Sequence, residues 1–172
     1  TTRLTLADGS VLGVPARRAL SFRSLTNTDA IPNRIVLPGI GTAGDPTLHG
    51  ATLRVYNAAG GVDNVSVALV TGPTGTWTMN SGGTVFQWKG LDPNGPVGRI
   101  KLKADVMTIK AGKSNWGYTL NEAMQGSVAV RLQLGNGVTW CAQGGQPGFL
   151  PRRDGPDKFI AAPRTPPPVV CP

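Results

Sequence analysis

The sequence predicts an all-β protein, a single β-sandwich of immunoglobulin-like or jelly-roll-like form, with an extended N-terminal arm and a proline-rich C-terminal tail. Three observations predict this class. The length of 172 residues suits one domain. The 24 glycines and 15 prolines disfavour long helices, because both residues destabilise a helix interior. Short runs of alternating apolar and polar residues are separated by turn residues, which is typical of a sandwich or barrel.

The predicted body spans residues 18–142 and consists of short strands. In the run Ala51–Tyr56 apolar and polar residues alternate, as in a strand with one buried face. The run Arg99–Lys103 alternates in the same way, so its three bases are expected on the solvent face and Ile100 and Leu102 in the core. The expected strands are, in chain order, residues 19–25, 34–37, 51–56, 65–70, 84–88, 99–103, 106–109, 128–134 and 138–140.

The last two of these strands are expected to form a hairpin. Val128–Leu134 is followed by Gly135-Asn136-Gly137 and then by Val138–Trp140. A Gly-Asn-Gly connection supplies the positive φ angles that a tight hairpin turn needs. The one helical pattern in the sequence, Leu120–Met124, is too short for more than one or two turns.

Two segments lie outside the predicted body. Residues 1–17 contain two short apolar runs around an Asp8-Gly9 turn, so we expect a hairpin or an extended arm. Residues 143–172 are rich in glycine, proline and arginine and hardly alternate, so we expect a tail. Five of the last ten residues are prolines, which favours an extended polyproline conformation there.

The chain has two cysteines, Cys141 and Cys171. A disulfide between them would close a loop of about 30 residues and stabilise the fold by about 3–4 kcal/mol. Whether they pair within one chain or between chains stays open, as does the alternative of two buried thiols. A disulfide indicates an oxidising compartment. Because the chain also begins at Thr1 without an initiator methionine, we expect an exported protein, extracellular or on the cell surface, whose signal peptide has been cleaved.

The formal net charge of +8 raises the question of an acidic partner. Residues 97–113 carry five bases against one acid, but no block of five like charges occurs in the chain. This spread does not predict specific binding to nucleic acid. No apolar run approaches the roughly 20 residues that span a bilayer, so no membrane-spanning helix is expected.

Residues suited to catalysis or to holding a cofactor are scarce. His49 is the only histidine and Glu122 the only glutamate, and no Gly-x-Ser-x-Gly turn marks a nucleophilic serine. One histidine and two cysteines without Cys-x-x-Cys spacing do not predict a zinc site. Aspartates stand in turn sequences such as Asp45-Pro46, Asp92-Pro93 and Asp154-Gly155, where their expected role is turn formation. We therefore expect no catalytic residue, no metal site and no cofactor, in a protein that is not an enzyme.

Aromatic and basic side chains offer one candidate surface for a ligand. Lys101, Lys103, Trp88 and Trp116 are the candidate contacts for an acidic or neutral glycan. The alternative stays open that the tryptophans are anchors of the sandwich core, as large aromatic residues commonly are.

Two stretches of the sequence belong together: residues 41–57, GTAGDPTLHGATLRVYN, and residues 117–134, GYTLNEAMQGSVAVRLQL. Together they resemble a β-rich module of secreted proteins from environmental Gram-negative bacteria. The resemblance extends over about residues 20–145 and rests on structural positions. It implies an exported β module and no particular activity.

The scarcity of catalytic residues and the extended ends favour a structural role. We expect an exported protein that assembles head to tail with copies of itself into a filament, sheath or surface layer. The arm would add as a strand to the open sheet edge of a neighbour, with Leu4, Leu6, Val11 and Val14 filling pockets there. Two alternatives stay open: a glycan-binding β-sandwich module, and a virion decoration or tail protein.

Overall fold

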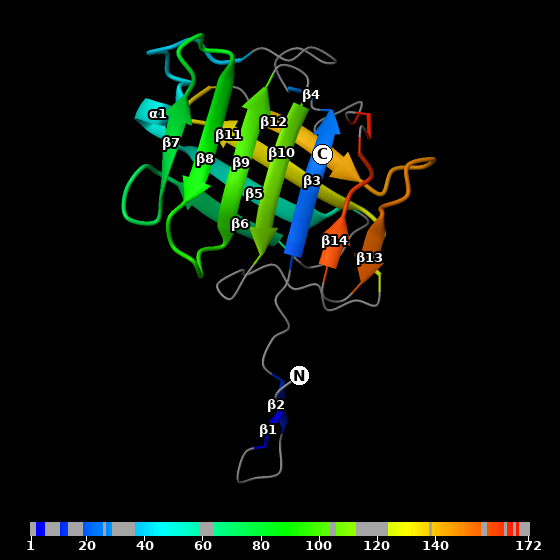
Figure 1. Cartoon of the computed structure of the whole chain (residues 1–172). Coiled ribbons are helices and arrows are strands. Elements are labelled where there is room, and N and C mark those ends of the chain that lie inside the picture. The colour runs from blue at the N-terminus through cyan, green and yellow to red at the C-terminus, as the bar shows by residue number, and fades with distance from the viewer. Residues whose placement is uncertain are drawn as a thin grey trace.

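The structure is a computed structural model of the whole chain. It describes residues 37–58, 64–103, 106–112, 124–137, 139–155, 158–163, 165–166 and 168, together with the backbone of residues 3–5, 11–13, 19–25 and 27–28. Antiparallel sheets pack face to face in two layers (Figure 1). The prediction of an all-β sandwich is therefore confirmed.

The front layer in Figure 1 is a seven-stranded sheet. Its strands are, in spatial order, β13 (Arg153–Gly155), β14 (Lys158–Ile160), β3 (Ala19–Leu25), β10 (Val106–Gly112), β9 (Val97–Lys103), β8 (Val85–Gly90) and β7 (Gly75–Met79). All neighbours are antiparallel except β14, which runs parallel to β3.

The second layer is a five-stranded antiparallel sheet. Its order is β4 (Asn27–Thr28), β12 (Thr139–Gly144), β11 (Val128–Leu134), β5 (Ala51–Asn57) and β6 (Asn64–Leu69). A third, two-stranded sheet pairs β1 (Arg3–Thr5) with β2 (Val11–Gly13) and shares no strand with the other two.

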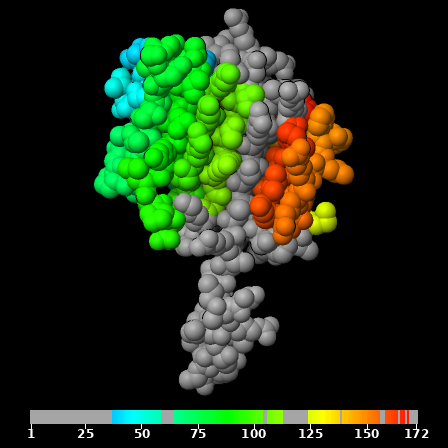
Figure 2. Space-filling view, viewed as in Figure 1, coloured from blue at the N-terminus to red at the C-terminus, as the bar shows by residue number. Residues whose placement is uncertain are grey.

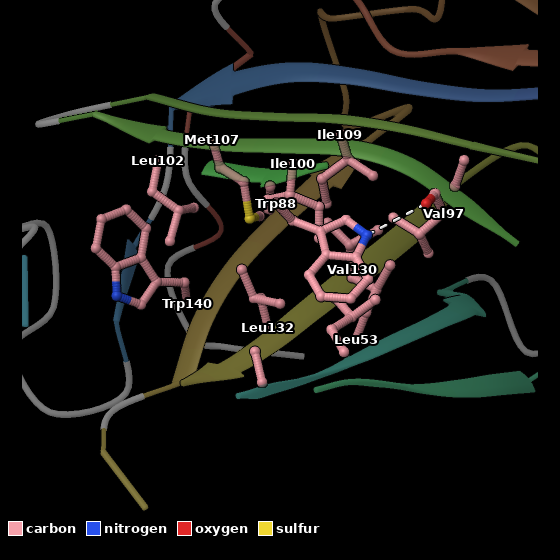
Figure 3. Packing of buried hydrophobic residues seen from close by; sticks show 14 of the residues in the cluster. Leu53, Trp88, Val97, Ile100, Leu102, Met107, Ile109, Val130, Leu132 and Trp140 are labelled. Atoms are coloured by element: carbon pink, nitrogen blue, oxygen red, sulfur yellow. Dashed lines mark hydrogen bonds between the residues drawn. The ribbon is translucent and has the colours of Figure 1, made fainter. Parts of the chain in front are cut away.

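The core lies between the two large sheets and is built by the alternation that the sequence shows (Figure 3). Ile100 and Leu102 of β9 face inward, as predicted, and meet Leu53 and Leu132 of the opposite layer. The Trp88 indole lies among them and donates a hydrogen bond from Nε1 to the carbonyl oxygen of Val97 at 3.3 Å.

The predicted hairpin of β11 and β12 is confirmed, with Gln133 opposite Thr139 at its end. Gly135 has a φ of 50°, the left-handed conformation that favours glycine. Close packing also requires glycine here, because a Cβ on Gly135 would lie 2.8 Å from Cβ of His49 and one on Gly137 would lie 2.7 Å from Cα of Gly44. The hairpin turn thus packs against the loop that carries the single short helix of the described residues, α1 (Pro46–His49).

Four strands, β4, β7, β13 and β14, and this helix were not predicted from the sequence. β4 holds two residues, and β13 and β14 hold three each in a stretch rich in glycine and proline, too few to show alternation. The alternation of the five residues of β7 was overlooked. The sandwich therefore does not end at residue 142, because β14 pairs with β3 and β13 continues that sheet. The strand predicted at 34–37 and the helix predicted at 120–124 lie outside the described residues, except Leu37 and Met124, which belong to no helix or strand.

Candidate functional site

The outer face of the seven-stranded sheet gathers basic side chains from four strands. We call this set the basic face; it consists of Lys89, Arg99, Lys101, Lys103, Lys110 and Lys158. Each alternates along its strand with a residue buried in the core, as Lys101 does with Ile100 and Leu102. Figure 2 looks onto this face, where β7 to β10 form one continuous surface.

The register of the strands brings the charges of the basic face close together. Arg99 lies directly opposite Lys89 of β8 on one side and Lys110 of β10 on the other. Neighbouring strands are about 4.8 Å apart and alternate residues of a strand about 6.7 Å apart. The row Lys89, Arg99 and Lys110 across β8, β9 and β10 thus meets the row of Arg99, Lys101 and Lys103 along β9 at Arg99, and together they form a T-shaped array of positive charge.

Among the described residues, no carboxylate neutralises the charges of the basic face. No residue of this set forms an ion pair in the part of the chain that the structure describes. Arg99 donates a hydrogen bond to the neutral Gln87 side chain at 3.0 Å. Like charges directly opposite each other on a sheet repel and lower stability, so an acidic partner laid across the face would relieve this repulsion.

The described carboxylates are engaged elsewhere, with backbone amides. Asp45 caps α1 and accepts bonds from the Gly41 and Thr47 amides, both at 2.9 Å. Asp92 accepts one bond from the Asn94 amide at 2.8 Å within its turn. These two aspartates have the turn role that the sequence predicts.

Asp154 has a different role from the one expected of the Asp154-Gly155 turn. Its carboxylate accepts bonds from the amides of Gln125 at 2.6 Å and Gly126 at 2.8 Å, nearly thirty residues away. It therefore joins β13 to the segment that leads into β11. Sequence spacing holds no signal for such a contact, because the two segments meet only in the folded chain.

The three tryptophans that the structure describes do not form a binding surface. Trp88, a predicted contact, is only 2% exposed, and Trp77 and Trp140 are 4% and 0% exposed. Trp77 and Trp88 pack on each other in the core with ring centroids 5.8 Å apart. The prediction for Trp88 is therefore wrong, because its position alternates with Lys89 and points between the sheets. Trp116 lies outside the described residues.

The predicted lysines do lie on the surface. Lys103 is exposed and Lys101 half-buried, both on the outer side of β9. Lys89, Lys110 and Lys158, which belong to the same face, were not predicted from the sequence. Alternation within residues 85–90 and 106–112 signals the orientation of Lys89 and Lys110, but only the strand order of the sheet places them beside β9.

Cys141 is buried on β12 and is disulfide-bonded. Cys171, the only other cysteine of the sequence, lies outside the described residues. The Cys141–Cys171 pairing therefore stays a prediction. Of the arm residues, Leu4 belongs to β1 and Val11 to β2, while Leu6 and Val14 lie outside the described residues.

His49 is exposed at the end of α1. Burial raises the pKa of the neighbouring Asp45 carboxyl, but the bonds from Thr47 and Gly41, with a smaller influence of His49, outweigh burial and lower that pKa below its ordinary value. Within the described ranges no three histidine, cysteine or acidic residues are grouped as metal ligands would be, and no helix is long and apolar enough to cross a membrane.

Comparisons with protein-family models, curated proteins and solved structures found no match for the chain. The resemblance of about residues 20–145 to a secreted β module therefore stays a prediction. What the protein does has to be argued from its own surface, and the basic face is the most distinctive feature of that surface.

Proposed function

We propose that this protein binds an acidic polysaccharide, one bearing carboxylate or sulfate groups, across its basic face. The observation that carries the proposal is the gathering of six cations on one flat sheet face with no ion pair among the described residues. Charge complementarity of this kind attracts a polyanion and aligns it.

The shape of the face favours a polysaccharide over nucleic acid. Proteins read double-stranded DNA by inserting a helix or ribbon into a groove, and they bind single strands by stacking bases on exposed aromatic rings. The basic face is the outer surface of a sheet, and the described tryptophans, Trp77, Trp88 and Trp140, are buried. For the same reason a neutral glycan, which would depend on stacking, is a poorer candidate. The disulfide at Cys141 supports an exported protein that would meet such polymers outside the cell.

The proposal is tested by measuring affinity for dextran sulfate and alginate, with neutral dextran as the blank. The double variant Lys101→Gln/Lys103→Gln removes two of the three charges that β9 contributes to the face. Exposed ion pairs contribute about 0.2–1 kcal/mol each, so we expect the affinity to fall by up to about 30-fold. Binding should also weaken as salt rises from 50 to 500 mM, since exposed charges are screened.

A control matched in charge for the single variant Lys101→Gln is Arg152→Gln, which removes an exposed cation that precedes β13, outside the basic face. We expect Arg152→Gln to retain most of the affinity for both polymers, whereas Lys101→Gln should lower it by up to about fivefold. An equal loss in the two single variants would mean that net charge alone attracts the polymer, and would refute the basic face as a site. Tighter binding of single-stranded DNA than of either polysaccharide would assign the face to nucleic acid instead.

A second candidate function, self-assembly by strand addition, is favoured by the edge strand β6. Natural proteins block an open sheet edge with charged residues or proline. Residues 64–69 of the edge strand β6 contain neither. The other edge at this end of the sandwich, β7, is partly blocked, because the Thr71 hydroxyl accepts the amide of Trp77 at 3.1 Å. An arm added to β6 would build the head-to-tail polymer expected from the sequence, whether in a filament, a surface layer or a virion.

This second candidate is tested by light scattering after size-exclusion chromatography. Deleting residues 1–14, or placing a charge on the edge by Ser66→Lys, should leave monomers where the wild type forms polymers. Thr78→Lys on β7 adds the same charge to the partly blocked edge and should not alter assembly. A monomeric wild type, or assembly that survives the Ser66→Lys change, would overturn strand addition at β6.

A further inference from the structure

The outer face of the five-stranded sheet holds a shallow depression of about 110 Å³. Thr52 and Arg54 of β5, Arg131 and Gln133 of β11 and Thr139 of β12 line it. The lining side chains are two guanidinium groups, two hydroxyls and one amide. No acidic residue lines the depression.

The two arginines of the depression face each other without a partner. Arg54 and Arg131 are directly opposite in the register of β5 and β11, where Cβ atoms are about 4.5–5.5 Å apart. Neither forms an ion pair or a side-chain hydrogen bond in the described chain. Two like charges in this relation repel, and their neighbours across the strands are Ser66 on β6 and Cys141 on β12, neither of them an acid. The folded protein thus retains an electrostatic cost that an anion between the guanidinium groups would remove.

Tyr56 adds an unpaired polar group beside this pair. It follows Arg54 by two positions on the same face of β5, and its hydroxyl is buried without a hydrogen-bond partner among the described residues. Burial raises the pKa of the Tyr56 hydroxyl, while the positive charges of Arg131 and Arg54 lower it by less. The hydroxyl therefore stays protonated at neutral pH and keeps a proton to donate.

We propose that the depression between Arg54 and Arg131 binds a single oxyanion group, a sulfate or a carboxylate, which bridges the two guanidinium groups. Arginine donates two parallel hydrogen bonds to such groups, and Thr52 and Gln133 at the neighbouring register position supply further neutral donors. The site differs from the basic face in kind, because it is small and holds one anion, whereas the basic face is an extended array. It lies on the opposite side of the sandwich, so the inference does not depend on the proposed function.

The probes that test this site are inorganic sulfate and acetate, each titrated against chloride at constant ionic strength. Nuclear magnetic resonance spectra of the arginine side-chain Nε–H groups and of the β5 and β11 amides report binding residue by residue. We expect saturable shifts at Arg54 and Arg131 with at least one anion, and the preferred anion shows whether the site takes sulfate or carboxylate. Linear shifts that never saturate with either anion would overturn the proposal.

Variants separate the site from general charge effects. Charge-assisted hydrogen bonds contribute about 1.5–3 kcal/mol, so Arg131→Gln should weaken the binding of the preferred anion at least tenfold. The control Arg152→Gln removes an exposed arginine that precedes β13, outside the depression and the basic face, and should leave binding unchanged. Equal weakening in both variants would overturn the site.

A second measurement uses the repulsion itself. Without sulfate and at low salt, Arg131→Gln should raise the midpoint of thermal unfolding, because it removes one of two opposed charges. Sulfate stabilises proteins in general. The decisive quantity is therefore the rise of the thermal midpoint that sulfate causes in the wild type minus the rise that it causes in Arg131→Gln. An unchanged or lower midpoint for Arg131→Gln at low salt would contradict the unrelieved repulsion on which the site depends.

Discussion

Replacing Asp45 by alanine perturbs the connection between α1 and the hairpin turn of β11 and β12. The Asp45 carboxylate is 1% exposed and accepts three hydrogen bonds, from the Gly41 amide and from the amide and hydroxyl of Thr47, the last at 2.6 Å. Loss of a helix cap costs about 0.5–2 kcal/mol, and a buried donor left unpaired costs about 1–3 kcal/mol more.

The expected loss for Asp45→Ala is about 2 kcal/mol, near the low end of the combined range. Gly41 is exposed, so water can satisfy its amide once the carboxylate is gone, whereas Thr47 is half-buried. For a chain of this size the loss corresponds to a fall of about 4–8 °C in the midpoint of thermal unfolding. Urea unfolding followed by tryptophan fluorescence at pH 7 measures the free energy directly.

The effect of Asp45→Ala should depend on pH, with a sign given by the lowered pKa of Asp45. A carboxyl whose pKa is lowered by folding contributes stability above its unfolded pKa and loses it as pH falls through the folded value. The difference between wild type and variant should therefore be full at pH 7 and shrink below about pH 4.

The control Asp92→Ala removes a single bond to Asn94 in an exposed turn and should cost less than 1 kcal/mol. Equal losses for the two variants at pH 7, or an Asp45→Ala difference that is the same at pH 3 and pH 7, would refute the reasoning.

Three further predictions concern the core and Tyr56. Trp88→Ala should lower the free energy of unfolding by about 3–5 kcal/mol; a loss under 1 kcal/mol in urea unfolding would contradict its place in the core. Gly75→Ala should lower the thermal midpoint, because its Cβ would lie 2.6 Å from Cη2 of the Trp88 ring; an unchanged midpoint would show that the ring yields freely. Tyr56→Phe should be neutral or stabilising at pH 7, since the buried hydroxyl has no partner. Because folding raises the Tyr56 pKa, the wild type should lose stability above about pH 10, and the variant should lose less. An equal loss of stability in the two proteins between about pH 8 and pH 11 would argue against this.

Strand alternation was sufficient to predict most of the sandwich. Arg99 to Lys103 alternate over a full strand, so both the solvent position of Lys101 and the core position of Leu102 follow from sequence. β13 and β14 were not predicted, because strands of three residues contain too few positions to establish a period. Their pairing with β3 is a contact between segments far apart in the chain, and local propensity does not determine it.

The candidate site was predictable only in part for a related reason. The orientation of Lys89 can be inferred from its own strand, but its position beside Arg99 depends on which strands are neighbours in the sheet. The same holds for Arg54 and Arg131, which are 77 positions apart in sequence and opposite each other in the fold. Trp88 was a candidate surface contact on the basis of its residue type alone. The alternation of its strand places it on the side of the sheet opposite Lys89, in the core.

The most direct test of the basic face is a nitrogen–proton correlation spectrum of the protein titrated with a short, uniform alginate oligomer. Binding across the basic face predicts saturable shifts confined to the amides of β8, β9, β10 and β14, largest near Arg99, Lys101 and Lys103, that vanish in 500 mM salt. Shifts centred on any other surface, or a spectrum unchanged at saturating oligomer, would contradict binding of an acidic polysaccharide at this face.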